Sequence, residues 1–239
     1  MRKSFSLRAS VLLTLVLAFV LALPALAQNS ANKPVPRTDE WWQKRHASFN
    51  ERVAQGNADL IFIGDSITQG WEGAGEAVWE KFYGGRNAVN LGISGDRTQH
   101  VLWRLDNGNI NGISPKLAVI MIGTNNVKDN TAGEIAGAIG DIVRKLRAKL
   151  PQMKILLLDV FPREEKPGEF RAKLEEVNKQ IAELNDGQHV FFLDIGDKFT
   201  EPDGTLPKSV MPDFLHPNKK GYEIWAEAIE AKVSELLGE

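Results

Sequence analysis

The chain has 239 residues, with 29 basic and 31 acidic side chains and a formal net charge of −2. This near-neutral balance gives no sign of a nucleic-acid partner, and the length is ample for one α/β domain with a buried core. The chain has no cysteine, which excludes disulfides, thiolate metal sites and a cysteine nucleophile.

Residues 1–27 predict a signal peptide. A basic start is followed by an apolar run over 11–23 and then by Ala25-Leu26-Ala27, which places small residues where signal peptidase requires them. The basic residues are Arg2, Lys3 and Arg8. The alternative is an uncleaved membrane anchor, for which the apolar run is short.

Cleavage after residue 27 would start the mature chain at Gln28. We therefore expect an exported protein, periplasmic or secreted, with no stable membrane span once the signal is removed. Residues 28–36 are polar and contain proline, as is typical of a disordered leader. The remaining residues, 37–239, contain no repeat or linker and predict one domain.

Short apolar runs alternate with amphipathic helical patterns along this domain. The predicted strands are 60–63, 88–91, 117–122, 155–160 and 190–195, and the clearest helices are 134–150, 170–184 and 222–237. Alternating strands and helices predict right-handed crossovers and a parallel sheet of five strands. In such a sheet a site lies beyond the carboxyl ends of the strands, where small and polar residues follow here.

Ser66 follows the first strand and is the candidate nucleophile. A serine hydroxyl needs a base to remove its proton, and a serine in this place is otherwise a common helix cap. Thr68 stands where the G-x-S-x-G elbow of α/β-hydrolases has its second glycine. The chain also contains no G-x-G-x-x-G or Walker lysine that would indicate phosphate binding.

The four histidines differ in their surroundings. His46 and His189 are expected at the surface or at an edge, and His100 either lines the site or packs. His216 has Asp213 three residues before it and a proline directly after it, which puts it on an extended segment at the mouth of the last helix. We predict that Asp213 orients this imidazole as a general base; the alternative is that Asp213 caps the helix beside an incidental histidine.

Acyl transfer also requires hydrogen-bond donors for the developing oxyanion. The Ser66 amide, the Gly92 amide and the Asn125 side chain follow three strands that we expect to be adjacent. Each of the last two residues alone is equally consistent with an ordinary turn. Together with Ser66 and His216 they predict an oxyanion hole.

The ordered blocks Gly64-Asp65-Ser66, Gly92, Gly123-Thr124-Asn125 and Asp213-x-x-His216 resemble those of the SGNH or GDSL hydrolase superfamily. Residues 90–105 and 213–222 are most similar to the branch of the platelet-activating-factor acetylhydrolase Ib catalytic subunits. This resemblance implies a flavodoxin-like three-layer α/β/α sandwich and a Ser66–His216–Asp213 triad. It also implies an oxyanion hole of Ser66, Gly92 and Asn125, with no metal or organic cofactor. The export signal is a departure from that branch and leaves the physiological substrate open.

The preferred hypothesis is a serine esterase that removes short acyl groups, such as acetate, from carbohydrates or other small polar esters. The alternatives are a lipid or phospholipid acylhydrolase and a non-catalytic carbohydrate-binding module. The partner is then a small-molecule ester, and the protein is a monomer or a homodimer.

Some tryptophans are expected in the core, and others are candidates for contact with a ligand or a partner protein. Trp79 and Trp103 are expected in the core, whereas Trp71 either stacks on a sugar or packs. Trp41 and Trp42 are expected to pack an N-terminal helix onto the sheet, with a partner surface as the alternative.

Overall fold

The computed structural model describes residues 29–239, so the expected signal peptide lies outside the described residues. The strands are β1 (Leu60–Gly64), β2 (Ala88–Gly92), β3 (Leu117–Met121), β4 (Lys154–Leu158) and β5 (Val190–Leu193). The helices are α1 (Glu40–Ala54), α2 (Ser66–Gln69), α3 (Glu76–Tyr83), α4 (Thr98–Asp106), α5 (Ala132–Lys149), α6 (Glu169–Ala182) and α7 (Lys219–Leu237). Across residues 29–239, none of these helices has the length and apolar character needed to cross a membrane.

All neighbouring strands are parallel, in the order β2-β1-β3-β4-β5, which confirms the predicted sheet. The chain moves outward from β1 to β2 and then returns to the other side of β1 for β3. Gly64 at the end of β1 is in register with Gly92 on one side and Met121 on the other. The loops after these three strands therefore leave the same edge side by side, where ligands bind in such sheets.

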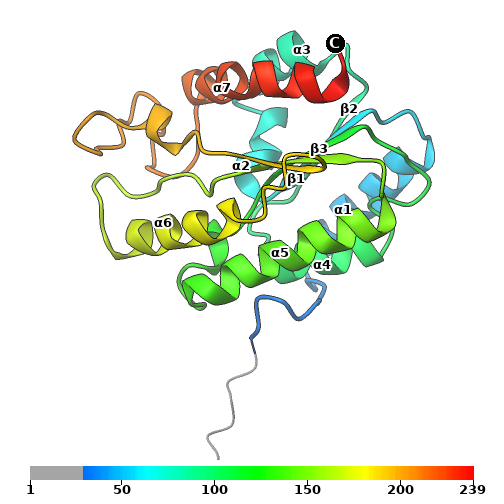
Figure 1. Ribbon diagram of the computed structural model, residues 1–239, viewed down its shortest axis with the longest axis horizontal. Helices are drawn as coiled ribbons and strands as arrows, with labels where there is room; N and C mark the ends of the chain where they lie inside the picture. The colour runs from blue at the N-terminus through cyan, green and yellow to red at the C-terminus, as the bar shows by residue number, and fades with distance from the viewer. Residues whose placement is uncertain (1–28) are drawn as a thin grey trace, which may run out of the picture.

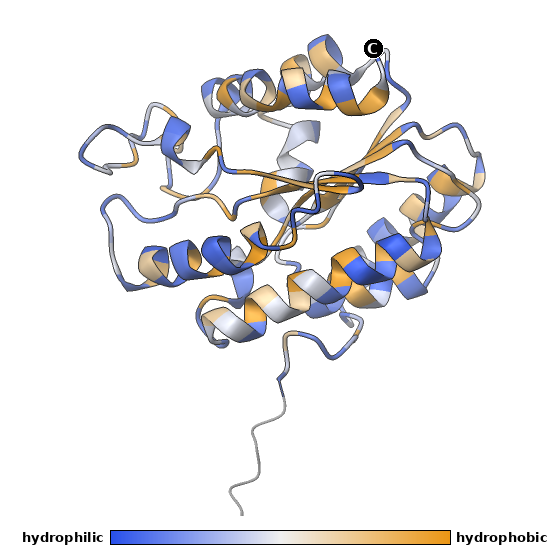
Figure 2. Cartoon of the chain, viewed as in Figure 1, coloured by the Kyte–Doolittle hydropathy of each residue, from blue (hydrophilic) through white to orange (hydrophobic). Residues whose placement is uncertain are grey.

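Two helical layers cover the sheet, giving the expected three-layer sandwich. Figure 1 shows α3 and α7 on one face and α1, α4, α5 and α6 on the other. Side chains of β1 alternate between two apolar cores: Ile61 and Ile63 face one, and Leu60 and Phe62 the other. Figure 2 shows this apolar character concentrated in the strands and on the inner faces of the helices.

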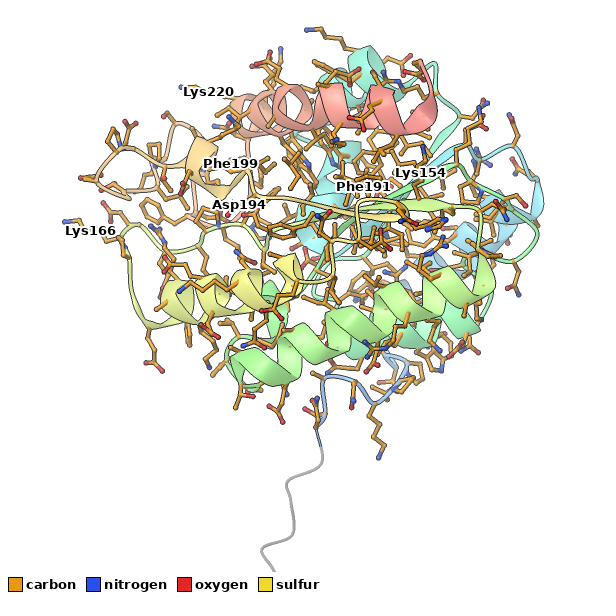
Figure 3. The ribbon with its side chains drawn as sticks, in the orientation of Figure 1. Lys154, Lys166, Phe191, Asp194, Phe199 and Lys220 are labelled. Carbon is orange, nitrogen blue, oxygen red and sulfur yellow. The ribbon has the colours of Figure 1, made fainter. Side chains whose placement is uncertain are left out.

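The fourth and fifth strands end earlier than predicted, at Leu158 and Leu193. The next residue after β4, Asp159, accepts the backbone N–H of Ile195 with its side chain at 2.9 Å. This side-chain bond takes the place of a backbone ladder bond. Lys154 at the start of β4 and Asp194 just beyond β5, both labelled in Figure 3, lie at the amino and carboxyl ends of these two neighbouring strands.

The described part of the expected leader, residues 29–36, contacts the domain near its start, whereas residues 32–35 are exposed. Ala31 is fully buried, and its carbonyl accepts the Thr98 hydroxyl at 2.7 Å. Asn130 donates to the Ser30 hydroxyl at 3.0 Å. The Ser30 side chain and the Ala31 backbone thus have hydrogen-bond partners on the folded domain, which sequence composition alone does not reveal.

The buried aromatic residues decide the alternative left open for Trp71 and correct the expectation for His46. Trp71 is 1% exposed and packs against Tyr222 with ring centroids 4.5 Å apart, so it belongs to the core. His46 was expected near the surface, but it is buried and stacks on Trp42. The reason is its position one turn after Trp42 on the inner face of α1. Trp42 packs this helix as expected, whereas Trp41 stays 46% exposed.

Candidate active site

Ser66 is held at the start of α2, directly beyond the buried strand β1. Asp65, which is fully buried, accepts the Ile67 N–H with its side chain at 3.0 Å and so caps this short helix. The cap is therefore Asp65, and the reading of Ser66 as the capping residue is wrong. As the first helical residue, Ser66 has an amide N–H that is not used by the helix's own hydrogen bonds.

His216 is brought against Ser66 from 150 residues away in the sequence. The distance between Ser66 Oγ and His216 Nε2 is 2.8 Å. On the other side of the ring, His216 Nδ1 is 2.6 Å from Asp213 Oδ2. Hydroxyl, imidazole and carboxylate thus form one continuous hydrogen-bonded chain.

The turn that begins at Asp213 orients its carboxylate toward the His216 ring. Its Oδ1 accepts the backbone N–H of His216 at 2.7 Å and that of Leu215 at 3.1 Å, while Phe214 takes a left-handed φ of 59°. The N-cap of α7 is Asn218, whose side chain accepts the Gly221 N–H. The alternative role of Asp213 as the helix cap is therefore wrong.

The charge on Asp213 is favoured by the same contacts. Partial burial raises the pKa of this carboxyl, but the hydrogen bonds from the His216 side chain and backbone outweigh it and leave the pKa below its usual value. An ionised carboxylate accepts the Nδ1 proton, which leaves Nε2 free to accept a proton from Ser66. The arrangement can serve general-base chemistry on the hydroxyl.

Gly92 lies against α2 so closely that no side chain would fit. A Cβ at this position would be 2.4 Å from the Gln69 backbone nitrogen. The Gly92 N–H donates to the Asn90 side chain at 2.9 Å, so an oxyanion would have to share or replace this bond.

Asn125, in the turn after β3, has its side-chain nitrogen 2.9 Å from the Asp96 carbonyl oxygen. The same nitrogen is 3.4 Å from a carboxylate oxygen of Asp65, which is a long contact. The structure thus brings the predicted oxyanion donors to adjacent strand ends. Asn125 can turn its second, loosely held hydrogen toward a ligand.

The sequence did not reveal what supports these donors. Arg45 in α1 donates to the Gly92 carbonyl at 2.9 Å and pairs with Glu72. Asp96 and Arg104, both in the block that carries the family resemblance, form a buried ion pair. Residue types in that block indicated polar character, but only the fold shows that these two side chains are inside.

His100, which was left open, packs at the start of α4. Its Nδ1 accepts the Arg97 N–H at 3.0 Å. Burial, together with the charges of Arg37, Arg97 and Arg104, lowers its pKa to about 4, so the ring is neutral near neutral pH. His189 precedes β5 at the sheet edge and is half-buried, as expected.

Comparison with known proteins agrees with this architecture. The model of the GDSL-like lipase/acylhydrolase family matches residues 62–224. The chain is 35% identical over 217 residues to platelet-activating factor acetylhydrolase IB subunit alpha1 of Pongo abelii, covering 89% of this chain and 93% of the relative.

Two solved structures show the same fold. A GDSL-like lipase of Bacteroides thetaiotaomicron is 25% identical with a TM-score of 0.67, covering 80% of this chain and 97% of the other. A catalytic mutant of an acetylxylan esterase from Geobacillus stearothermophilus is 20% identical with a TM-score of 0.60, covering 77% and 95%. From the family match and the long alignment to a relative above 30% identity, the chain belongs to the GDSL-like lipase/acylhydrolase family.

Proposed function

We propose that the protein is a serine esterase in which Ser66 is the nucleophile, His216 the general base and Asp213 the residue that orients the base. The observation that carries this proposal is the pair of short contacts through the His216 ring, 2.8 Å to Ser66 and 2.6 Å to Asp213. Such a relay is what makes a serine hydroxyl reactive at neutral pH.

The reaction proceeds in two halves. Ser66 Oγ attacks the ester carbonyl carbon while His216 Nε2 takes the hydroxyl proton, and the oxyanion is held by the amides of Ser66 and Gly92 and by Asn125. The carbon–oxygen bond to the alcohol then breaks, and His216 gives its proton to the departing oxygen. Water, activated by His216, attacks the acyl-Ser66 in the same way and releases the acid.

The substrate class we propose is a short acyl ester, above all an acetate, of a carbohydrate or another small polar alcohol. Two likenesses support this choice. The curated relative is named an acetylhydrolase, and one structural neighbour is an acetylxylan esterase.

A fluorophosphonate serine probe and a graded ester series test the proposal. The wild-type protein should be labelled and should hydrolyse p-nitrophenyl acetate and acetylated xylo-oligosaccharides faster than long-chain esters. Ser66→Ala should abolish labelling and turnover, whereas Ser94→Ala, an exposed serine in the loop after β2, should not. Preference for long-chain esters would favour a lipid acylhydrolase, and absence of labelling would favour a binding module.

We also propose that residues 1–27 direct export and are removed. The support is the basic start, the apolar run and the small residues that end the segment. Mass spectrometry of the protein from an exporting host tests this: a mature chain that begins at Gln28 is expected, and an intact N-terminus in the membrane fraction would show an anchor.

A further inference from the structure

The helix that carries Ser66 is too short to fix its own position. Helix α2 has four residues, Ser66–Gln69, whereas isolated helices need three or more turns even to be marginally stable. Its place is therefore set by bonds from residues outside it. Asp65 caps it at the Ile67 N–H, and Asn90 donates to the Thr68 carbonyl at 3.0 Å.

A third bond joins α2 to the segment of the proposed base. The Tyr222 hydroxyl donates to the Ile67 carbonyl oxygen at 2.7 Å, across 155 residues of sequence. Tyr222 lies in the first turn of α7, which begins just after His216. Ile67, the residue directly after the proposed nucleophile, is thus bonded to Tyr222, which lies six positions after the proposed base.

The fold makes room for this hydroxyl and keeps it protonated. A Cβ at Gly70 would lie 2.0 Å from the Tyr222 oxygen, so only glycine fits beside it. Tyr222 is 1% exposed and packs against both Trp71 and Trp225. Burial, and then the nearby Asp65, raises the pKa of Tyr222 well above its usual value, so the hydroxyl remains a donor.

We propose that Tyr222 is a positioning residue, whose bond to Ile67 keeps Ser66 Oγ within proton-transfer distance of His216 Nε2. This inference rests on the proposed function. Ser66 Oγ and His216 Nε2 are 2.8 Å apart, and proton transfer between them requires that they stay within hydrogen-bond distance. A displacement of about 1 Å can lower the rate by on the order of 100-fold. Without the bond, α2 and the start of α7 are free to shift against each other.

The test is Tyr222→Phe, with Tyr83→Phe as the matched control. Tyr83 belongs to the same aromatic cluster, 5.5 Å from Trp71 between ring centroids, but its buried hydroxyl has no hydrogen-bond partner among the described residues. Tyr222→Phe should lower kcat and the rate of fluorophosphonate labelling by about 10- to 100-fold with little change in KM. Tyr83→Phe should change neither.

A second variant separates the bond from the packing. Gly70→Ala should push the hydroxyl away and give a similar loss, and the double variant Gly70→Ala/Tyr222→Phe should lose less than the product of the two effects, since both remove one bond. Thermal unfolding is recorded for each variant, so that a loss of kcat at unchanged KM is told apart from a loss of stability.

Three results would overturn the inference. Tyr222→Phe could lower only the unfolding temperature at unchanged kcat, it could act no differently from Tyr83→Phe, or it could raise KM alone. A wild-type protein that is not labelled at all would instead overturn the proposed function, and this inference with it. The two failures are therefore distinguishable.

Discussion

The Asp96 carboxylate and the Arg104 guanidinium form an ion pair at 2.8 Å, with 0% and 1% of their side chains exposed. Arg104 also donates to the carbonyls of Gly64 and Leu91, near the ends of β1 and β2. The Asp96 backbone carbonyl in turn accepts from Asn125. This pair therefore ties together the strand ends from which the proposed nucleophile and oxyanion donors emerge.

Arg104→Met should destabilise the protein strongly, because it leaves the Asp96 carboxylate buried without its partner. Burial already raises the pKa of Asp96 and lowers that of Arg104, and each partner's charge opposes that shift. We expect a loss of about 3–5 kcal/mol in the free energy of unfolding, measured by urea denaturation. Lys232→Met removes one partner of an exposed pair with Glu235 and should cost roughly 1 kcal/mol or less. Equal losses in the two variants would contradict this account.

Asn125→Ala should lower kcat by about 10²–10³ with a small effect on KM, because the lost donor acts on the oxyanion that forms only in the transition state. Steady-state kinetics on p-nitrophenyl acetate measure both constants. The control is Asn126→Ala: Asn126 is fully buried and accepts the Thr98 N–H at 3.0 Å, so its loss should lower stability more than kcat. An effect on KM alone would mean that Asn125 only binds substrate.

Activity should fall as the solution is made acidic, since a protonated His216 cannot accept the Ser66 proton. The pH–rate profile of kcat/KM measures this. His100→Gln should leave the acid limb unchanged, because the low pKa of His100, about 4, keeps that ring neutral over most of the range. A flat profile from about pH 5 to 8, or a limb that moves in His100→Gln, would argue against His216 as the base.

Asp159 should make the protein less stable as the pH rises. Burial, and then the nearby Asp194, raises its pKa to about 8, whereas an unfolded Asp loses its proton near pH 4. Between these values the folded state binds more protons than the unfolded state, so the free energy of unfolding decreases with pH. Asp65, with a pKa raised to about 7, contributes with the same sign.

Urea denaturation at a series of pH values tests this prediction. Asp159→Asn should flatten the decrease between about pH 4 and 8 by several kcal/mol, since each pKa unit corresponds to about 1.4 kcal/mol. Asp203→Asn is the control: its pKa is lowered by hydrogen bonds from Thr205, so its contribution is lost only in acid. An unchanged slope in Asp159→Asn would contradict a protonated Asp159.

Residue type and spacing were enough to predict the type and order of the main elements and to select the proposed catalytic residues. Buried strands are continuous apolar runs, and amphipathic helices repeat their apolar residues every three to four positions, so both patterns are local. The position of Ser66 after β1, and of Asp213 three residues before His216, is also local information. The predicted strands, helices and local positions of these residues therefore agree with the structure.

Which side chains are buried, and which contacts hold the site in place, could be learned from the fold alone. Trp71 and His46 are buried, the caps are Asp65 and Asn218, and Tyr222 reaches Ile67 across 155 residues. Burial depends on surfaces that come from distant segments, and a cap depends on backbone direction at one residue. Neither burial nor capping can be derived from residue type and spacing alone. The contacts that support the site could therefore be identified only from the fold.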